Sequence, residues 1–194
     1  MDIRRVEASP SGAERQAIDA LLGPPISAWD GGARGSKRDA HVATVGGADS
    51  RAMRHLLLPA LQALQARIGW ISEGGIGYVC DRLNVPPADA WGVATFYALL
   101  ATSPRPRRVM HICDDIACKC RGVDQLIAEL ERASSSAPAA SSTSDLEAPA
   151  SAWHRSPCLG MCDQAPAAYV TIAGEHPQEL QIGRVTLARV KEVL

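Results

Sequence analysis

Apolar residues recur at helical spacing in the middle of the chain and predict three short helices. The apolar positions of the first helix are Met53, Leu57, Leu61, Leu64 and Ile68. Ser72 can cap a second helix, whose apolar positions are Ile76, Val79, Cys80 and Leu83. A third helix starts at Pro86 and Pro87, where a missing N–H costs nothing, and its apolar stripe consists of Val93, Phe96, Tyr97 and Leu100. Brief connections between three such helices predict a small helical bundle over residues 51–103.

The pattern changes after a connector rich in proline and arginine at residues 102–108. Residues 108–113 predict a strand, and apolar positions between Gly122 and Arg132 predict an amphipathic helix. Two further apolar runs, 167–173 and 178–182, predict a β-hairpin around Gly174, and Thr186 starts a closing helix. This order of elements is compatible with a small α/β layer over residues 104–194. The predicted fold class is therefore α+β, with a helical bundle first and an α/β domain after it.

Two segments have a composition that disfavours a packed core. Residues 1–50 are rich in Gly, Ser, Ala and Arg, and only residues 17–22 resemble a short helix. We expect a flexible N-terminal extension there, with little fixed structure in the absence of a partner. Residues 133–151 consist mostly of Ser, Ala and Pro and predict a low-complexity insertion. Cysteines lie on both sides of this insertion, so it falls inside the second domain rather than between domains.

Composition and charge exclude several classes of function. Hydrophobic residues make up 46% of the chain but aromatic residues only 4%, so the core must consist mainly of Leu, Val, Ile and Ala. The net charge of −1 argues against a nucleic-acid partner. No apolar run approaches the roughly 20 residues of a membrane span, and residues 1–12 lack the apolar stretch of a secretory signal. We expect a cytoplasmic protein, in which cysteines serve more often as metal ligands or redox groups than as disulfides.

Five of the six cysteines form two short clusters. The first cluster is Cys113-x₄-Cys118-x-Cys120, at the end of the predicted strand, and the second is Cys158-x₃-Cys162. A loop of three or four residues can turn two thiolates toward one metal, while two loops hold a centre from opposite sides. A [2Fe–2S] cluster has two irons, each with two protein ligands, and cysteine thiolates are the usual ones.

The spacing alone leaves other metal sites open. A structural zinc site also uses four cysteines in close pairs. Cys120 lies two residues after Cys118 and could replace it as a ligand, whereas Cys80 falls on an apolar helix face and is expected in the core. His111 and His154 precede the two clusters, and a Rieske centre uses two histidines. Four sulfur ligands are already available, so we expect ordinary surface or hydrogen-bonded histidines.

Three stretches of the chain resemble one known family. They are Pro86-Pro87 followed by Gly92-Val93-Ala94-Thr95-Phe96-Tyr97, the segment Cys113-x₄-Cys118 with Arg121-Gly122 behind it, and Ser156-Pro157-Cys158-Leu159-Gly160-Met161-Cys162-Asp163-Gln164-Ala165-Pro166-Ala167. Together they are similar to the 24 kDa iron–sulfur subunit of respiratory complex I, which is the E-type subunit of that complex. The same family includes subunits of NAD-reducing hydrogenases and NAD-dependent formate dehydrogenases. The resemblance covers residues 56–194 apart from the low-complexity insertion.

The resemblance implies a helical domain followed by a thioredoxin-like domain that carries one [2Fe–2S] cluster. It implies that Cys113, Cys118, Cys158 and Cys162 bind this cluster, and it favours iron–sulfur over zinc. In relatives the subunit docks on a flavin- and NADH-binding iron–sulfur subunit, so FMN and NAD(H) are expected on that partner. This chain has no glycine-rich dinucleotide fingerprint after a strand. We therefore expect a non-catalytic electron carrier in a complex with further iron–sulfur and catalytic subunits.

The host complex and one rival function stay open at this point. The host can be an NADH dehydrogenase, whose soluble arm belongs to a membrane-attached complex, or a formate dehydrogenase or hydrogenase. The rival is a free-standing thioredoxin-like [2Fe–2S] ferredoxin that shuttles electrons alone. The helical bundle argues against the rival, because a shuttle needs only the cluster domain. Cys120, the insertion and the long N-terminal extension depart from the family pattern.

Overall fold

The computed structural model describes residues 8–25, 51–135 and 151–194 of the chain. Most of the predicted extension and of the predicted insertion therefore lies outside the described residues. The chain divides into two units, which we describe separately. The helical unit comprises residues 1–104 and 173–176, and the sheet unit comprises residues 105–172 and 177–194. No helix in the described ranges has the length and apolar character needed to cross a membrane.

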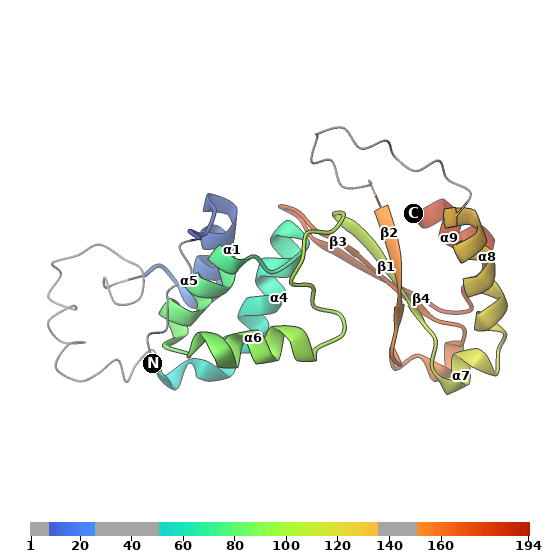
Figure 1. Cartoon of the computed structure of the whole chain (residues 1–194), viewed down its shortest axis with the longest axis horizontal. Helices are drawn as coiled ribbons and strands as arrows, with labels where there is room; N and C mark the ends of the chain where they lie inside the picture. Colours follow the sequence, from blue (N-terminus) through green and yellow to red (C-terminus); the bar gives the residue numbers. More distant parts are fainter. Residues whose placement is uncertain (1–7, 26–50, 136–150) are drawn as a thin grey trace, which may run out of the picture. The chain divides into compact units, whose positions relative to one another are not determined.

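The helical unit contains four α-helices within the described residues, drawn from blue to green in Figure 1. They are α1 (Gly12–Leu22), α4 (Leu57–Ile68), α5 (Glu73–Leu83) and α6 (Pro87–Phe96), with a short 3-10 helix, η2 (Arg54–Leu56), before α4. Helix α4 ends at Gly69, which takes the left-handed conformation that suits glycine. The Ser72 hydroxyl accepts a hydrogen bond from the Gly75 amide at 2.9 Å, as expected for the cap of α5. Pro87 is the first residue of α6.

Aliphatic side chains fill the core of the helical unit. Leu61 and Leu64 of α4 are fully buried, and burial of one such side chain contributes about 1.5–3 kcal/mol. The predicted apolar face of α5 is confirmed, because all its members are buried: Ile76, Val79, Cys80 and Leu83.

The predicted stripe of α6 is wrong at two positions. Phe96 is 80% exposed and Tyr97 is 43% exposed. The helix instead buries Ala90 and Ala94. Phe96 lies two residues after Ala94, which at 100° per residue places it on the opposite side of the helix. Helix α6 is apolar on both sides, so its sequence did not indicate which side faces the core.

The expectation of little fixed structure in the N-terminal extension does not hold for residues 8–25. Helix α1 spans eleven residues and begins with a capping box, in which Ser11 and Glu14 each bond the backbone of the other. Ile18 is fully buried among residues of α4 and α5. Arg82 of α5 forms an ion pair with Asp19 of α1, and Tyr78 donates a hydrogen bond to the same carboxylate at 2.7 Å. These contacts give α1 a place in the helical core.

The sheet unit has four strands in the order β2-β1-β3-β4. They are β1 (Arg108–Cys113), β2 (Ser151–Ser156), β3 (Ala168–Ile172) and β4 (Gln178–Ile182). Strand β1 is parallel to β2 and antiparallel to β3, and β3 is antiparallel to β4. The predicted hairpin is present as β3 and β4. The sequence did not indicate β2, because Ser, His and Arg interrupt its apolar residues.

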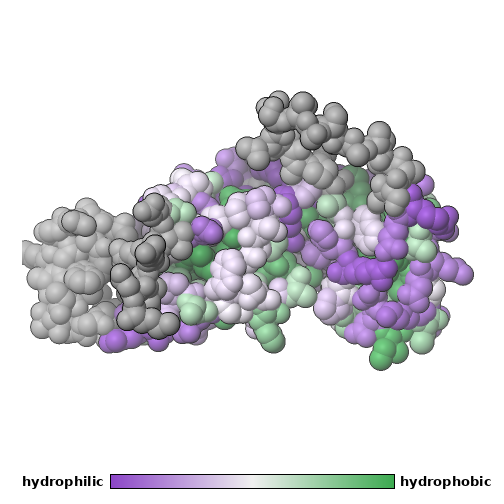
Figure 2. Space-filling model, in the orientation of Figure 1, coloured by the Kyte–Doolittle hydropathy of each residue, from purple (hydrophilic) through white to green (hydrophobic). Residues whose placement is uncertain are grey.

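Helices cover one face of this sheet. Helix α8 (Val123–Ser135) and helix α9 (Leu187–Val193) pack on the face that carries Met110, Ile112 and Val170. On the side shown in Figure 2, hydrophilic residues in purple gather where Figure 1 places α7 and α8, as expected for the outward face of an amphipathic helix. Two short helices complete the unit: α7 (Ile116–Lys119) follows β1, and η3 (Cys162–Gln164) begins at the last cysteine of the second loop.

Candidate functional site: two cysteine loops at one edge of the sheet

The parallel strands β1 and β2 end side by side. Cys113, the last residue of β1, is the Cα partner of Ser156, the last residue of β2. The Asp114 amide donates a hydrogen bond to the Ser156 carbonyl at 3.0 Å, which holds the two chain exits together. Because parallel strands present their carboxyl ends at the same edge, both cysteine loops leave the sheet at this point.

Local structure then turns two more cysteines back toward the same edge. The Asp115 side chain caps α7 by accepting a hydrogen bond from the Ile116 amide at 2.7 Å, and this short helix carries Cys118. In the second loop, Gly160 has a φ of +76°, a conformation that favours glycine. This turn lies between Cys158 and Cys162.

The four thiols form two close pairs. The sulfur atoms of Cys158 and Cys162 lie 3.5 Å apart. Cys113 and Cys118 share a hydrogen bond, and each also interacts electrostatically with Cys162. The structure thus brings together all four residues predicted from the sequence. Cys113 and Cys118 are buried, whereas Cys158 and Cys162 are exposed.

Backbone amides donate to one sulfur of each pair. The Ala167 amide bonds the Cys118 thiol, and the Gly160 amide bonds the Cys158 sulfur at 3.5 Å. Burial, partly opposed by the Ala167 hydrogen bond, raises the pKa of Cys118 to about 11, with Cys113 adding to the rise. The hydrogen bond that Cys162 shares with its neighbour Cys158 is the main cause that raises the pKa of Cys162. The raised pKa values favour the protonated thiols of Cys118 and Cys162, so binding a metal there would release their protons.

The other two cysteines lie outside this group. Cys120 follows the last residue of α7 and is exposed. Cys80 is buried in the core of the helical unit, as predicted, and burial raises the pKa of its thiol to about 11.

The two histidines do not join the thiols. His111 and His154 are Cα partners on β1 and β2, with ring centroids 6.2 Å apart. His111 is buried, and its Nε2 has no hydrogen-bond partner among the described residues. Burial is the main cause that lowers the pKa of His111 to about 4.

The arrangement of sulfurs favours a dinuclear centre. A tetrahedral zinc site needs four donors around one atom, whereas a [2Fe–2S] cluster needs two donors at each of two irons. Two separate thiol pairs meet the second requirement.

Residues 46–194 match the thioredoxin-like [2Fe–2S] ferredoxin family. The chain belongs to this family. The name of the family includes the [2Fe–2S] cluster, and a pair of thiols for each iron suits such a cluster. The predicted α+β fold with a thioredoxin-like [2Fe–2S] domain is confirmed.

Three relatives are each named as the E subunit of an NADH-quinone oxidoreductase. The chain is 33% identical to the Escherichia coli K12 protein over 111 residues, which are 56% of this chain and 63% of the relative. It is 30% identical to the Pseudomonas aeruginosa protein over 112 residues, which are 57% of this chain and 64% of the relative. It is 36% identical to the Salmonella typhimurium protein over 75 residues, which are 39% of this chain and 45% of the relative. The chain thus spans less than two thirds of these relatives, and the resemblance seen in its motifs is confirmed.

Sequence reasoning missed two contributors to this site. Asp115 fixes the start of the helix that carries Cys118, and an Asp directly before a helix is a signal that the sequence does contain. The Ala167 amide lies on a segment far from Cys118 in the sequence. Only the pairing of β1 with β3 brings it near, so no local pattern could have indicated it.

Proposed function

We propose that this chain is an electron-transfer subunit with one [2Fe–2S] cluster bound by Cys113, Cys118, Cys158 and Cys162. The observation that carries the proposal is the meeting of these four thiols, in two pairs, at the ends of adjacent parallel strands. When bound, the cluster accepts and releases one electron at a time. The residues of this chain hold it and control its surroundings.

The donors present fit such a group. Four thiols can supply the four ligands, and Cys113 and Cys118 lie on the buried side, where water is excluded. The amides of Ala167 and Gly160 point at sulfur, and such hydrogen bonds favour the more negative, reduced form. The second loop, with Cys158 and Cys162, is exposed, so electrons would enter or leave on that side.

The partner in this proposal is a flavin- and NADH-binding iron–sulfur subunit. The name of the three relatives supports it, since it places them in an NADH-oxidising complex. FMN and NAD(H) would bind to the partner, because this chain lacks a glycine-rich dinucleotide fingerprint. Further iron–sulfur and catalytic subunits complete an NADH dehydrogenase, a formate dehydrogenase or a hydrogenase in the cytoplasm. The helical unit would supply much of the docking surface, and the exposed Phe96 and Tyr97 fit that role.

Co-purification with NADH reduction tests the assignment. A tagged chain expressed in its own cells should pull down a flavoprotein, and NADH added to that complex should produce the electron paramagnetic resonance signal of a reduced [2Fe–2S] centre in this chain. The Cys158→Ser variant should still bind the flavoprotein but lack that signal. If the tagged chain elutes alone with its cluster, the ferredoxin shuttle is the better assignment.

A further inference from the structure

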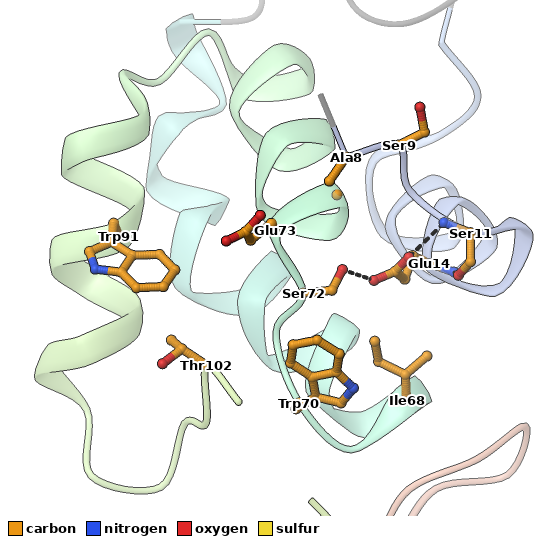
Figure 3. A pocket seen from close by; sticks show the side chains of 11 residues that line it. Ala8, Ser9, Ser11, Glu14, Ile68, Trp70, Ser72, Glu73, Trp91 and Thr102 are labelled. Atoms are coloured by element: carbon orange, nitrogen blue, oxygen red, sulfur yellow. Dashed lines mark hydrogen bonds between the residues drawn. The ribbon is translucent and has the colours of Figure 1, made fainter. Parts of the chain in front are cut away.

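The helical unit contains a cavity of about 600 Å³ beside the start of α5, shown in Figure 3. Its walls come from residues 8–14, from the connection between α4 and α5, from α6 and from Thr102. Every residue that lines the cavity belongs to the helical unit, so none of them comes from the cysteine loops. The proposed electron transfer leaves this cavity without a role.

Two tryptophans border the cavity from different elements. Trp70 lies in the connection between α4 and α5, and Trp91 projects from α6 toward the same opening (Figure 3). Trp91 is 44% exposed, although an indole gains much from burial. The face of an indole attracts cations, and arginine stacks on it with its flat guanidinium group.

The charged residues that line the cavity are both acidic. They are Glu14 and Glu73, and no Lys, Arg or His is among the described residues that line it. Glu14 is only 4% exposed, and its Oε2 accepts a hydrogen bond from the Ser11 amide at 2.6 Å. Its Oε1 accepts from the Ser72 hydroxyl. Glu73 is exposed, so its carboxylate is available to a ligand.

Two arginines of the helical unit, Arg15 and Arg82, contact groups outside the cavity. Arg15 lies over the Tyr78 ring, 5.0 Å from its centroid, on α5. Arg82 bonds Asp19 and the Gly23 carbonyl. Neither of these arginines lines the cavity, and its described lining contains no basic residue that would offset the two carboxylates.

We propose that this cavity binds a guanidinium group. Two indoles and the exposed Glu73 carboxylate suit a flat cation that stacks and donates several hydrogen bonds, whereas a compact ammonium ion uses only its charge. The Thr102 side chain, also at the wall, adds a hydroxyl acceptor. The group belongs either to a small guanidino compound or to an arginine of a protein partner, and the chemistry of recognition is the same.

The test compares ethylguanidinium with ethylurea, which has nearly the same planar shape and no charge. The full chain is labelled with ¹⁵N, and the indole N–H signals are followed by nuclear magnetic resonance. Ethylguanidinium at up to about 10 mM should shift the signals of Trp70 and Trp91 and leave that of Trp153, in the sheet unit, in place. Ethylurea should shift none of them. No shift with ethylguanidinium, or equal shifts with both compounds, would overturn the proposal.

Variants connect the binding to the named residues. Trp91→Leu and Glu73→Gln should each weaken ethylguanidinium binding about tenfold, as expected for loss of a stacking or charged contact. Glu129→Gln, an equivalent exposed change on α8, should leave it unchanged. Both altered side chains are exposed, and unchanged circular dichroism would show that the variants fold. Binding that survives in both variants would overturn the proposal.

Measurements on the assembled complex distinguish the two sources of the guanidinium group, a partner's arginine and a small guanidino compound. If an arginine of a partner occupies the cavity, the complex should no longer respond to ethylguanidinium, and Trp91→Leu should weaken assembly. If the ligand is a small guanidino compound, the response should persist in the complex. Trp91→Leu and Glu73→Gln leave all six cysteines unchanged, and the cluster is measured separately by its electron paramagnetic resonance signal, so failure of the cavity proposal and failure of the cluster proposal are distinguishable.

Discussion

His111 and His154 lie opposite one another on the parallel strands β1 and β2, with their ring centroids 6.2 Å apart. Burial is the main cause that lowers the pKa of His111 to about 4, and the nearby charges of Arg105 and His154 add to it. The folded protein therefore holds this imidazole neutral. The unfolded chain takes up a proton as the pH falls below about 6.5.

This difference predicts acid sensitivity of folding. The stability contributed by neutral His111 is complete above about pH 6.5 and is lost as the pH falls toward 4, because the unfolded state binds more protons in that range. His111→Phe removes this titration. Between about pH 8 and about pH 5, the free energy of unfolding of the wild type should fall by about 2 kcal/mol more than that of the variant.

Urea unfolding at both pH values measures this difference. His176→Phe is the matched control, because His176 is exposed, and it should follow the wild type. Parallel pH dependences for the wild type and His111→Phe would contradict the assignment of a neutral, buried His111.

The ion pair between Arg82 and Asp19 predicts that α1 contributes to stability. Arg82 is 3% exposed, so removal of Asp19 takes the negative partner away from a buried positive charge. Asp19→Asn should lower the free energy of unfolding by about 2 kcal/mol, since the Gly23 carbonyl still accepts one hydrogen bond from Arg82. Urea unfolding followed by circular dichroism measures the loss. Glu192→Gln, which breaks the exposed pair with Arg189, should cost less than about 0.5 kcal/mol.

The six thiols should differ in their reaction with a maleimide. Cys120 is exposed and lies outside the proposed ligand set, so it should react within minutes in the protein that holds its cluster. Cys80 should stay unmodified, because burial shields it and raises its pKa to about 11. Mass spectrometry of tryptic peptides identifies the modified residue. Rapid modification of Cys80 in the folded protein, or protection of Cys120, would contradict these placements.

Much of the fold could be predicted from local sequence patterns. Ser72 as a cap, Pro87 at the first position of α6 and the apolar face of α5 all follow from rules that act within one helix. The cysteine spacing indicated the candidate site for a similar reason, since each loop returns two thiols over a few residues. The convergence of the two loops depends on the pairing of β1 with β2.

The features that the sequence did not indicate depend on distant partners. Helix α1 is held by Asp19 and Ile18 against helices that follow it by more than thirty residues, so the polar composition of its surroundings gave the wrong prediction. The prediction of a buried Phe96 fails because α6 carries apolar residues on both sides, so its sequence does not show which side packs against the core. Strand β2 forms where β1 offers an open edge, and its own residues are mostly polar.

Four single Cys→Ser variants test the account most directly, compared with the wild type by metal analysis, acid-labile sulfide and electron paramagnetic resonance after reduction. Wild-type protein isolated without oxygen should hold about two irons and two sulfides per chain and give the signal of a reduced [2Fe–2S] cluster. Substitution of Cys113, Cys118, Cys158 or Cys162 should abolish or strongly alter that signal, and Cys120→Ser and Cys80→Ala should preserve it. One zinc per chain without sulfide, or a cluster that survives Cys118→Ser and is lost in Cys120→Ser, would contradict the account.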